Sequence, residues 1–479
     1  MTETSERAAK GWVLALTALA SSMVALDALV VATALSAIRL DLGASIEALE
    51  WTVNAYTLSF AVLLLTGAAL GDRYGRRRLF VIGIGLFVTA SAGCALAGSV
   101  GWLIAARAVQ GAGAALVMPL AMALLSAAFP REERGDALGI FSGVTGLALI
   151  AGPVVGGAVA SGIAWQWIFW INVPIGLVAM TLARSRIPES HGPGTAIDIV
   201  GVALVTGAAL AMVWGLMRGN AAGWTSREVV AALAAGLLLA VTFVAWELRV
   251  EAPMAPMRFF RSRCFSSGIA ASFLFYAAMY GTLFLLPQFL QTAQGHGPLG
   301  AGLRLLPWTA TTFIVAPIAG SLVNRLGERP LIVLGVMLQA LGMGWIALIA
   351  TPDLAYIWLV APLILAGAGV SMAMPAAQNA VLSAVATSEI GQASGLFNML
   401  RFLGGAFGVA ILAAAFAATG SLASPAAFSL GFAAAIGVAA ALSLAAAIAG
   451  MWQPSRRDIV LPQGEAFPAA PARAIRNAR

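Results

Sequence analysis

Two stretches of the chain indicate the fold most strongly, LIAARAVQGAG at residues 103–113 and GPVVGG at residues 152–157. The first places Arg107 inside an otherwise apolar run, and the second is a ridge of glycine and valine around one proline. A guanidinium is costly in hydrocarbon, so within a membrane it is expected to face a protein interior or a water-filled path. Both stretches therefore favour a membrane protein with a polar interior, and a transporter is the first hypothesis.

Composition extends the membrane interpretation to nearly the whole chain. Of the 479 residues, 61% are hydrophobic and 10% are charged, and the mean hydropathy is +0.92; globular chains are about half apolar and a quarter charged. A crossing needs about 20 apolar residues. We therefore expect an all-α polytopic membrane protein with fourteen transmembrane helices, at 12–37, 51–71, 79–98, 102–122, 137–160, 165–183, 197–217, 227–247, 265–290, 303–323, 331–350, 356–376, 393–416 and 426–452.

Basic residues set the expected orientation, because they accumulate in cytoplasmic loops. With the N-terminus inside, 21 of the 27 Lys and Arg residues lie on the inner face, four on the outer face, and Arg107 and Arg401 within spans. We expect a multi-pass protein of the cell (inner or plasma) membrane with both termini cytoplasmic. The net charge of +7 then reflects topology and predicts no nucleic-acid partner. Cys94 and Cys264 lie too far apart for a disulfide, and no metal site or cofactor is predicted.

An internal repeat divides the chain. The Gly-Ala-Gly, Met-Pro and Gly-x-Ala-x-Gly-x-Phe elements of residues 111–141 recur at 367–397, and the charged loop pattern of residues 70–77 recurs at 322–329. Many transporters are repeated bundles around a site near the membrane midplane. The predicted parts are a cytoplasmic tail (1–11), a six-helix bundle (12–190), two inserted helices (191–250), a second six-helix bundle (251–452) and a disordered cytoplasmic tail (453–479).

Several motifs resemble those of the major facilitator superfamily. GDRYGRRR at residues 71–78 resembles its cytoplasmic loop motif, and the Arg107 and Gly152-Pro153 segments resemble its conserved-arginine and antiporter motifs. The segments 26–31, 51–56 and 165–176 are similar to signatures of the fourteen-helix drug:proton antiporters. Ala68 and Ala148 stand where the family motifs carry glycine, and Leu29 and Ala34-Leu35-Ser36 depart from the pattern around Asp27. The resemblance, over residues 12–452, implies the major facilitator fold and proton-coupled export by alternating access.

Asp27 is the expected proton-coupling residue, with Arg107 as its partner. It lies about fifteen residues into the first span, or ~22 Å along a helix, near the middle of the bilayer. A carboxyl balanced between burial and a nearby cation can load and release a proton. The alternative is a structural carboxylate between helices, with Arg107 clamping backbone carbonyls. Gln110, one turn from Arg107, is a plausible companion on the same face.

Two further groups of residues are interpreted as moving parts. The short charged loop after the second span implies a cytoplasmic gate made of Asp72, Arg73, Gly75, Arg76 and Arg134, although a topology anchor explains the same charges. The antiporter segment, with Gly152, Pro153, Gly156 and Gly157, makes a thin, bent helix that approaches its neighbours closely. Ordinary tight packing is the alternative there.

Substrate contacts are expected from polar and aromatic groups inside apolar spans. Arg401, the only mid-span charge of the second half, is expected to meet an anionic group or cap backbone carbonyls. For each of the others, core packing or an interhelical hydrogen bond is the alternative. The candidates beside Arg401 are Asn54, Tyr56, Gln110, Met118, Gln288, Trp308, Gln339, Gln378, Asn379, Asn398 and Phe402.

These observations predict an exporter of lipophilic drugs or toxic compounds, cationic ones included, that acts as a monomer with protons, a small-molecule substrate and the lipid bilayer as partners. A dedicated exporter of one metabolite or self-made antibiotic is the alternative on the same scaffold. A non-transporting receptor is disfavoured, because we find no soluble signalling domain in this sequence. An intramembrane enzyme is disfavoured, because the sequence shows no group of catalytic residues in the middle of a span. The sequence also contains no phosphate-binding loop, so ATP is not the expected energy source.

Overall fold

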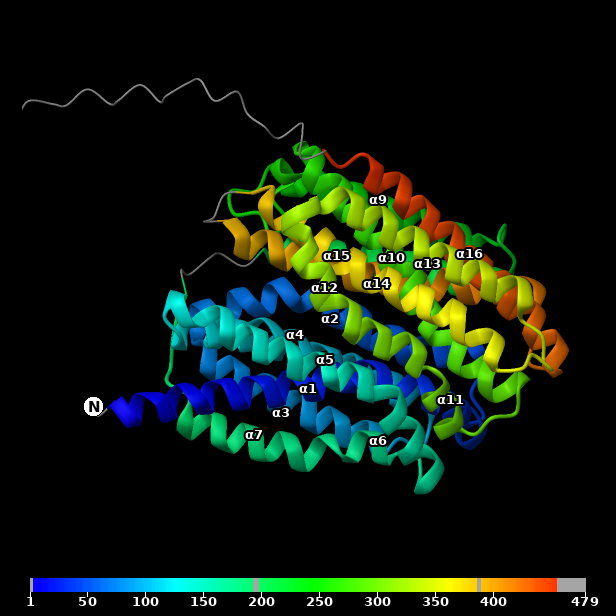
Figure 1. The fold of residues 1–479 in the computed structure, drawn as a ribbon, viewed down its shortest axis with the longest axis horizontal. Coiled ribbons are helices and arrows are strands. Elements are labelled where there is room, and N and C mark those ends of the chain that lie inside the picture. The colour runs from blue at the N-terminus through cyan, green and yellow to red at the C-terminus, as the bar shows by residue number, and fades with distance from the viewer. Residues whose placement is uncertain (1–2, 193–197, 386–388, 455–479) are drawn as a thin grey trace, which may run out of the picture.

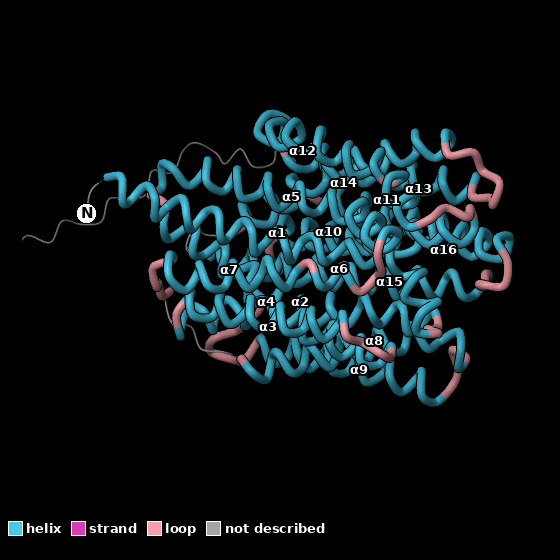
Figure 2. The backbone as a smooth tube through the Cα atoms, turned by 90° about the horizontal axis from the view of Figure 1, so that it is seen from below, coloured by secondary structure: helices cyan, strands magenta, loops and turns pink. Residues whose placement is uncertain are grey.

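The computed structural model describes residues 3–192, 198–385 and 389–454, without the side chains of residues 3–9, 131, 132, 134–136, 138, 139, 142, 149, 150, 313, 316, 317, 320, 321 and 323–325. Within this part the chain is helical and contains no strand (Figures 1 and 2). The helices are α1 (Glu3–Leu42), α2 (Ile46–Tyr74), α3 (Arg76–Ala95), α4 (Val100–Ala128), α5 (Arg131–Gly162), α6 (Trp167–Trp170), α7 (Asn172–Arg186), α8 (Ile199–Ala222), α9 (Arg227–Glu247), η1 (Met257–Arg261), α10 (Arg263–Gln288), η2 (Phe289–Ala293), α11 (Pro298–Arg304), α12 (Leu306–Leu326), α13 (Glu328–Ile349), α14 (Ile357–Ser383), α15 (Ile390–Thr419) and α16 (Pro425–Met451).

Thirteen helices in the described part are long and apolar enough to cross a membrane. They correspond to thirteen of the fourteen stretches expected from the sequence, with α6 and α7 together forming one span. The remaining stretch, 303–323, coincides with α12, which is helical but includes side chains outside the described set. The all-α membrane architecture is confirmed, and the number fourteen stays a prediction.

Serines lie at the starts of several apolar helices, and glycines lie at two of the helix boundaries. Serine hydroxyls accept a first-turn N–H at the starts of α2, α4, α9, α10 and α16, which satisfies one of the free donors there. Gly75 separates α2 from α3 with φ of 108°, and Gly327 precedes α13 with φ of 82°. Both backbones favour glycine. The two glycines hold equivalent places in the sequence repeat.

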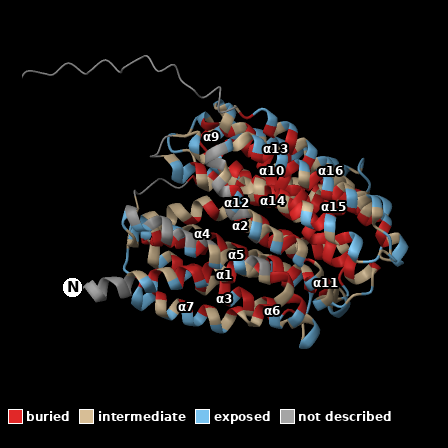
Figure 3. Cartoon of the chain, viewed as in Figure 1, coloured by how far each residue is buried: buried red, intermediate tan, exposed pale blue. Residues whose placement is uncertain are grey.

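Helix contacts fall into three groups. Helices α1 to α7 pack mainly on one another, as do α10 to α16, and α8 pairs with α9. The helix α8 also contacts α2 and α15, whereas α9 presents Leu237, Leu238 and Val241 to the outside. Buried residues lie where helices face each other (Figure 3). An apolar outer surface over a packed interior suits a lipid environment.

The two large groups meet closely at the end of the molecule that carries α11 (Figure 1). A Cβ atom on Gly157 of α5 would overlap the carbonyl oxygen of Pro298, and one on Gly302 of α11 would overlap that of Pro153. The Ser161 hydroxyl accepts the backbone N–H of Leu299 at 3.1 Å. Paired glycines therefore let α5 and α11 touch backbone to backbone, and this contact closes the α11 end.

Candidate functional site

A fully buried ion pair lies inside the first group of helices. Asp27 of α1 is 0% exposed and Arg107 of α4 is 1% exposed. Arg107 Nη1 donates to Asp27 Oδ2 and, at 2.6 Å, to Gln110 Oε1. Its Nε donates to the backbone carbonyl of Thr52 in α2 at 3.1 Å. The guanidinium thus joins α1, α2 and α4.

Two amides complete the shell of the carboxylate. Gln110 Nε2 donates to Asp27 Oδ1 at 2.9 Å, and Asn172 Nδ2 of α7 donates to the same oxygen at 3.1 Å. The Ser91 hydroxyl of α3 accepts from Gln110 at 2.7 Å and from Asn172 at 3.4 Å. Asp27 accepts from three side chains and donates to none, the arrangement of an ionised carboxylate. Five helices therefore converge on one negative charge.

This pair is costly to form and costly to break. Desolvating two ions offsets most of their attraction, so buried pairs add little net stability. Removing one partner alone leaves a buried charge and costs about 3–5 kcal/mol. A proton on Asp27 would have a similar effect, because it would neutralise the counter-ion of Arg107 and turn one acceptor into a donor. Protonation of Asp27 therefore favours rearrangement of its donors.

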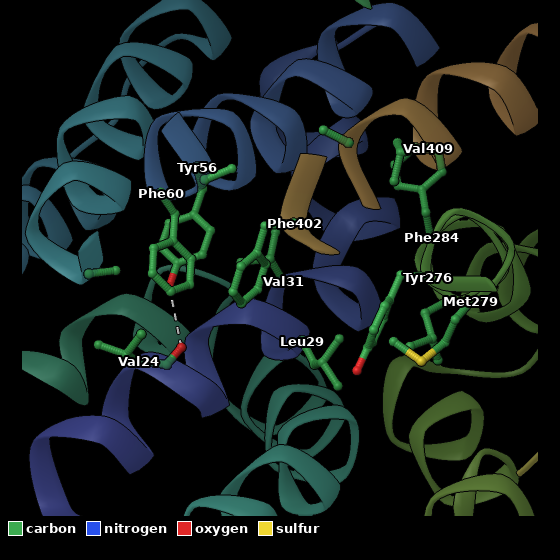
Figure 4. Close-up of a cluster of buried hydrophobic side chains, with 14 of the residues drawn as sticks. Val24, Leu29, Val31, Tyr56, Phe60, Tyr276, Met279, Phe284, Phe402 and Val409 are labelled. Carbon is green, nitrogen blue, oxygen red and sulfur yellow. Dashed lines mark hydrogen bonds between the residues drawn. The ribbon is translucent and has the colours of Figure 1, made fainter. Parts of the chain in front are cut away.

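A row of aromatic rings leads from the ion pair to the second group of helices. Arg107 Cζ lies 4.2 Å from the ring centroid of Tyr56, and Tyr56 lies 6.0 Å from Phe60 on the same helix. Phe60 contacts Phe402 of α15 with ring centroids 4.3 Å apart. Figure 4 shows Phe60 and Phe402 beside Val31 of α1. These rings join the two large groups of helices near α1.

The row ends at a second guanidinium. Arg401 Cζ lies 5.1 Å from the Phe402 ring centroid and 4.7 Å from that of Tyr276 in α10. Tyr280, one turn along α10, lies 6.2 Å from Tyr276 and 6.3 Å from Phe402. Cations stack favourably on aromatic faces. We call four rings the aromatic bridge: Tyr56, Phe60 and Phe402, which connect the two guanidiniums, and Tyr276, which stacks on Arg401.

Most other predicted substrate residues make contacts elsewhere. Met118 and Gln378 are half-buried and Trp308 is buried, and among the described residues none joins the hydrogen bonds or ring contacts above. Asn379 is exposed, and its side chain bonds to Glu328, which is not part of the aromatic bridge. The remaining hydrogen bonds run from Asn54 Nδ2 to Met217 Sδ (3.7 Å), Gln288 Nε2 to the Phe284 carbonyl (2.7 Å), Gln339 Nε2 to the Phe275 carbonyl (3.3 Å), Asn379 Nδ2 to Glu328 Oε1 (2.7 Å) and Asn398 Nδ2 to the Ser394 carbonyl (2.9 Å).

The charged loop between α2 and α3 is tied to its own half of the molecule. Asp72 pairs with Arg76 at 2.7 Å, and its carbonyl accepts from the N–H of Gly192 at 3.1 Å. Glu189 accepts the first-turn N–H groups of Arg77 and Arg78 at 2.8 and 3.2 Å. Arg73 is exposed beside Tyr74, and the side chain of Arg134, also predicted to belong to the gate, lies outside the described set. Among the described residues, Glu189 and Gly192 of the chain after α7 hold this loop.

The antiporter segment places its glycines on two faces of α5. Gly152 and Gly156 pack on α1, where a Cβ on Gly156 would lie 2.5 Å from the Val30 carbonyl oxygen. Gly157 faces α11, as described above, and the Pro153 carbonyl meets Gly302. The predicted close approach of this helix to its neighbours is therefore present on both sides.

Sequence reasoning missed three buried polar residues. Asn172 lies within the signature at 165–176, and Ser91 is a polar residue in an apolar span, so both had a signal in the sequence. Glu50 of α2 is 4% exposed, and among the described residues its Oε2 atom has no hydrogen-bond partner. The helix α2 that carries Glu50 packs against α4, α15 and α8.

The buried ion pair lies inside one group of helices and the aromatic row joins that group to the other; many transporters are built from two such repeated bundles. Residues 17–409 match the model of the Major Facilitator Superfamily. The chain is 34% identical over 395 residues to the "Tetracenomycin C resistance and export protein" of Streptomyces glaucescens, covering 81% of this chain and 73% of that protein. It belongs to the Major Facilitator Superfamily.

Further comparisons agree. The "Multidrug resistance protein Stp" of Mycobacterium tuberculosis is 34% identical over 404 residues, covering 84% of this chain and 75% of that protein. The partially occluded inward-open structure of the xylose transporter XylE from Escherichia coli matches with a TM-score of 0.63, at 16% identity, over 94% of this chain and 99% of that one. The structural likeness concerns the fold alone.

Proposed function

We propose that this protein is an efflux transporter that exports a small lipophilic compound in exchange for protons carried by Asp27. The observation that supports it best is the buried Asp27 carboxylate, held by Arg107 and two amides between five helices. The names of the relatives, a resistance and export protein and a multidrug resistance protein, support export. Nothing in this proposal requires a catalytic or ATP-binding site.

Proton exchange follows from the hydrogen bonds around Asp27. When the carboxyl binds a proton, Arg107 loses its counter-ion while remaining charged. The guanidinium then has Gln110 Oε1 and the Thr52 carbonyl as acceptors and the Tyr56 ring as a stacking partner. Movement of Arg107 toward these groups would shift α4 and α2 relative to α1. Proton binding and helix movement are coupled in this way.

Alternating access needs two ends that open in turn. The structure is closed at the α11 end by the α5–α11 glycine contact. Under the orientation predicted from basic residues, this end faces the outside and both termini are cytoplasmic, in the cell membrane. Separation of α5 from α11 would release the substrate outward. The Asp72–Arg76 loop would act as the cytoplasmic gate, with Glu189 anchoring it to the chain after α7.

The aromatic bridge is the proposed substrate site. It lies at the contact between the two large groups of helices, where a midplane site is expected in a repeat-built transporter. Tyr56 connects it directly to Arg107. A ligand that separates Phe60 from Phe402 would therefore act on the helices that hold the ion pair. The site uses residues of one chain, so a monomer suffices.

The helices α8 and α9 are proposed as supports of the two bundles. The α8 helix touches α2 and α15, one from each large group, and α9 lies outside it. The Asn220 side chain donates to the Ala414 carbonyl of α15, which fixes α8 to the second group. A dedicated exporter of one compound remains the second candidate, because the site is built from large rings that fit one shape as readily as several.

The test is efflux from energised cells. Cells expressing the protein should accumulate less of a fluorescent lipophilic compound than cells with an empty vector, and a protonophore should abolish the difference. A panel of compounds separates the broad exporter from the dedicated one. Equal accumulation with and without protonophore would contradict proton exchange while leaving export intact.

A further inference from the structure

The two ends of the aromatic bridge differ in their hydrogen bonding. At the first end, Arg107 has a carboxylate partner and Asp27 is surrounded by donors. At the second end, the Nε atom of Arg401 and the hydroxyl of Tyr276 are both buried and have no hydrogen-bond partner among the described residues. A buried donor without an acceptor carries a free-energy cost, because it has lost its hydrogen bonds to water. Within the described part of the chain, these two donors therefore have no acceptor at this end of the bridge.

Charge is unbalanced at the same place. None of the ion pairs among the described residues includes Arg401. The polar groups that interact with its guanidinium are those of Tyr276 and Tyr280, which are neutral. At the other end, the charges of Asp27 and Arg107 cancel, so that pair has no net charge. The bridge as a whole therefore has one net positive charge, which repels a cationic ligand and attracts an anionic one.

The direction of the free donors fits a ligand between the helix groups. Figure 4 shows the Tyr276 hydroxyl pointing from α10 toward Leu29 of α1, and thus toward the contact between the two groups. Arg401 precedes Phe402, whose ring lies on Phe60 across that contact. A flat ligand that takes the place of this ring contact would have its edge beside Arg401 and Tyr276.

We propose that Arg401 and Tyr276 form the subsite for an anionic oxygen, a carboxylate or phenolate, on a planar aromatic substrate whose rings lie along the aromatic bridge. This inference rests on the proposed efflux function and names its substrate class. A guanidinium fork matches a carboxylate in two parallel hydrogen bonds. The aromatic rings of the substrate replace the Phe60–Phe402 contact with stacked contacts of similar geometry. Lipophilic cations, included in the expectation from the sequence, are disfavoured.

The test compares two ligands that differ only in charge, anthraquinone-2-carboxylate and anthraquinone-2-carboxamide. Binding to the purified full-length protein in lipid nanodiscs is measured by equilibrium dialysis at neutral pH. The carboxylate should bind at least about tenfold more tightly, the effect expected of hydrogen bonds to a charged group. Arg401→Gln should bring the two affinities within about twofold of each other, and Tyr276→Phe should reduce the preference. Arg401→Lys should keep part of it.

Arg304→Gln is the matched control. Arg304 also stacks on a tyrosine, with its Cζ 5.2 Å from the Tyr356 ring centroid, but at the α11 end and away from the bridge. Its replacement should leave the preference for the carboxylate unchanged. Equal binding of both ligands to the unmodified protein, binding of neither, or a preference that persists in Arg401→Gln would each overturn the subsite.

Failure of the subsite can be told from failure of the proposed function. Proton-linked export is measured separately in vesicles with ethidium, a permanent cation, and with the anthraquinone carboxylate. Export of ethidium with no selectivity for the carboxylate would overturn the subsite and retain the exporter. Selective carboxylate binding without proton-linked export of either compound would retain the subsite and contradict the proposed function.

Discussion

Substituting Asp27 with Asn tests the energetics of the buried ion pair. The new side chain keeps its shape but removes the negative charge, and its amide group places a donor among the donors of Arg107, Gln110 and Asn172. Arg107 stays charged and buried, with the Thr52 carbonyl and Gln110 as acceptors. The loss of one partner from a buried pair predicts a fall of about 3–5 kcal/mol in the free energy of unfolding.

The double substitution Asp27→Asn with Arg107→Gln separates the charge effect from other damage. It removes both ions, so the free energy of unfolding should recover by about 2 kcal/mol or more over the sum of the two single losses. Reversible unfolding in mixed detergent micelles measures all four proteins of this cycle. Transport should remain absent in the double variant, because stability and proton exchange are separate consequences of the same pair.

An additive cycle would refute this account of the pair. If the two single losses sum to the loss in the double variant within about 0.5 kcal/mol, Asp27 and Arg107 do not interact in the folded protein. A single Asp27→Asn loss below about 1 kcal/mol would also contradict it, since that is the size of an exposed ion pair.

Three further changes test other contacts. Gly157→Leu should separate α5 from α11, so that a cysteine placed at Ser161 reacts several-fold faster with an impermeant maleimide; unchanged labelling would contradict the closed glycine contact. Glu189→Ala should lower the free energy of unfolding by about 0.5–2 kcal/mol, the size of a lost helix cap, in thermal unfolding, and no loss would show that the cap is unimportant. The pKa of His296 lies below its ordinary value because of desolvation and the charge of Arg304. The imidazole is therefore neutral at neutral pH and above, and His296→Gln should leave the pH profile of transport unchanged there; a shifted profile would assign it a role in transport.

The helices could be predicted because they depend on composition alone. Long apolar runs gave thirteen candidate spans at the expected places, and the loop pattern at residues 70–77 and 322–329 placed Gly75 and Gly327 at helix ends where φ is positive. The antiporter glycines were identified as close-packing positions for the same reason. Their particular neighbours, Val30 of α1 and Pro298 at the start of α11, depend on tertiary packing and could not be read from local sequence.

The site was predicted in part. Asp27, Arg107 and Gln110 stood out as charged and polar residues within apolar spans, and they meet in the structure. Asn172 and Ser91 join them from α7 and α3, because five helices converge there, which no spacing in the sequence indicates. The substrate candidates were selected by residue type alone. The amides of Gln288 and Asn398 bond to carbonyls of their own helices, and those of Asn54, Gln339 and Asn379 bond to other helices, which satisfies them without a ligand.

The contacts of the charged loop between α2 and α3 also could not be predicted from local sequence. The sequence indicated a gate from charge density, and that gate stays a prediction. In the structure Asp72 pairs with Arg76, and Glu189, more than a hundred residues away, accepts the first N–H groups of α3. A lone glutamate in a connecting segment has no local pattern that assigns it a partner. Only the path of the chain after α7 does so.

Substrate-driven proton release from everted membrane vesicles tests the central claim most directly. Under an imposed pH gradient, addition of an exported compound to vesicles with the unmodified protein should release protons, and Asp27→Asn vesicles with equal protein content should release none. Proton release by Asp27→Asn equal to that of the unmodified protein would contradict the role assigned to Asp27 in proton exchange.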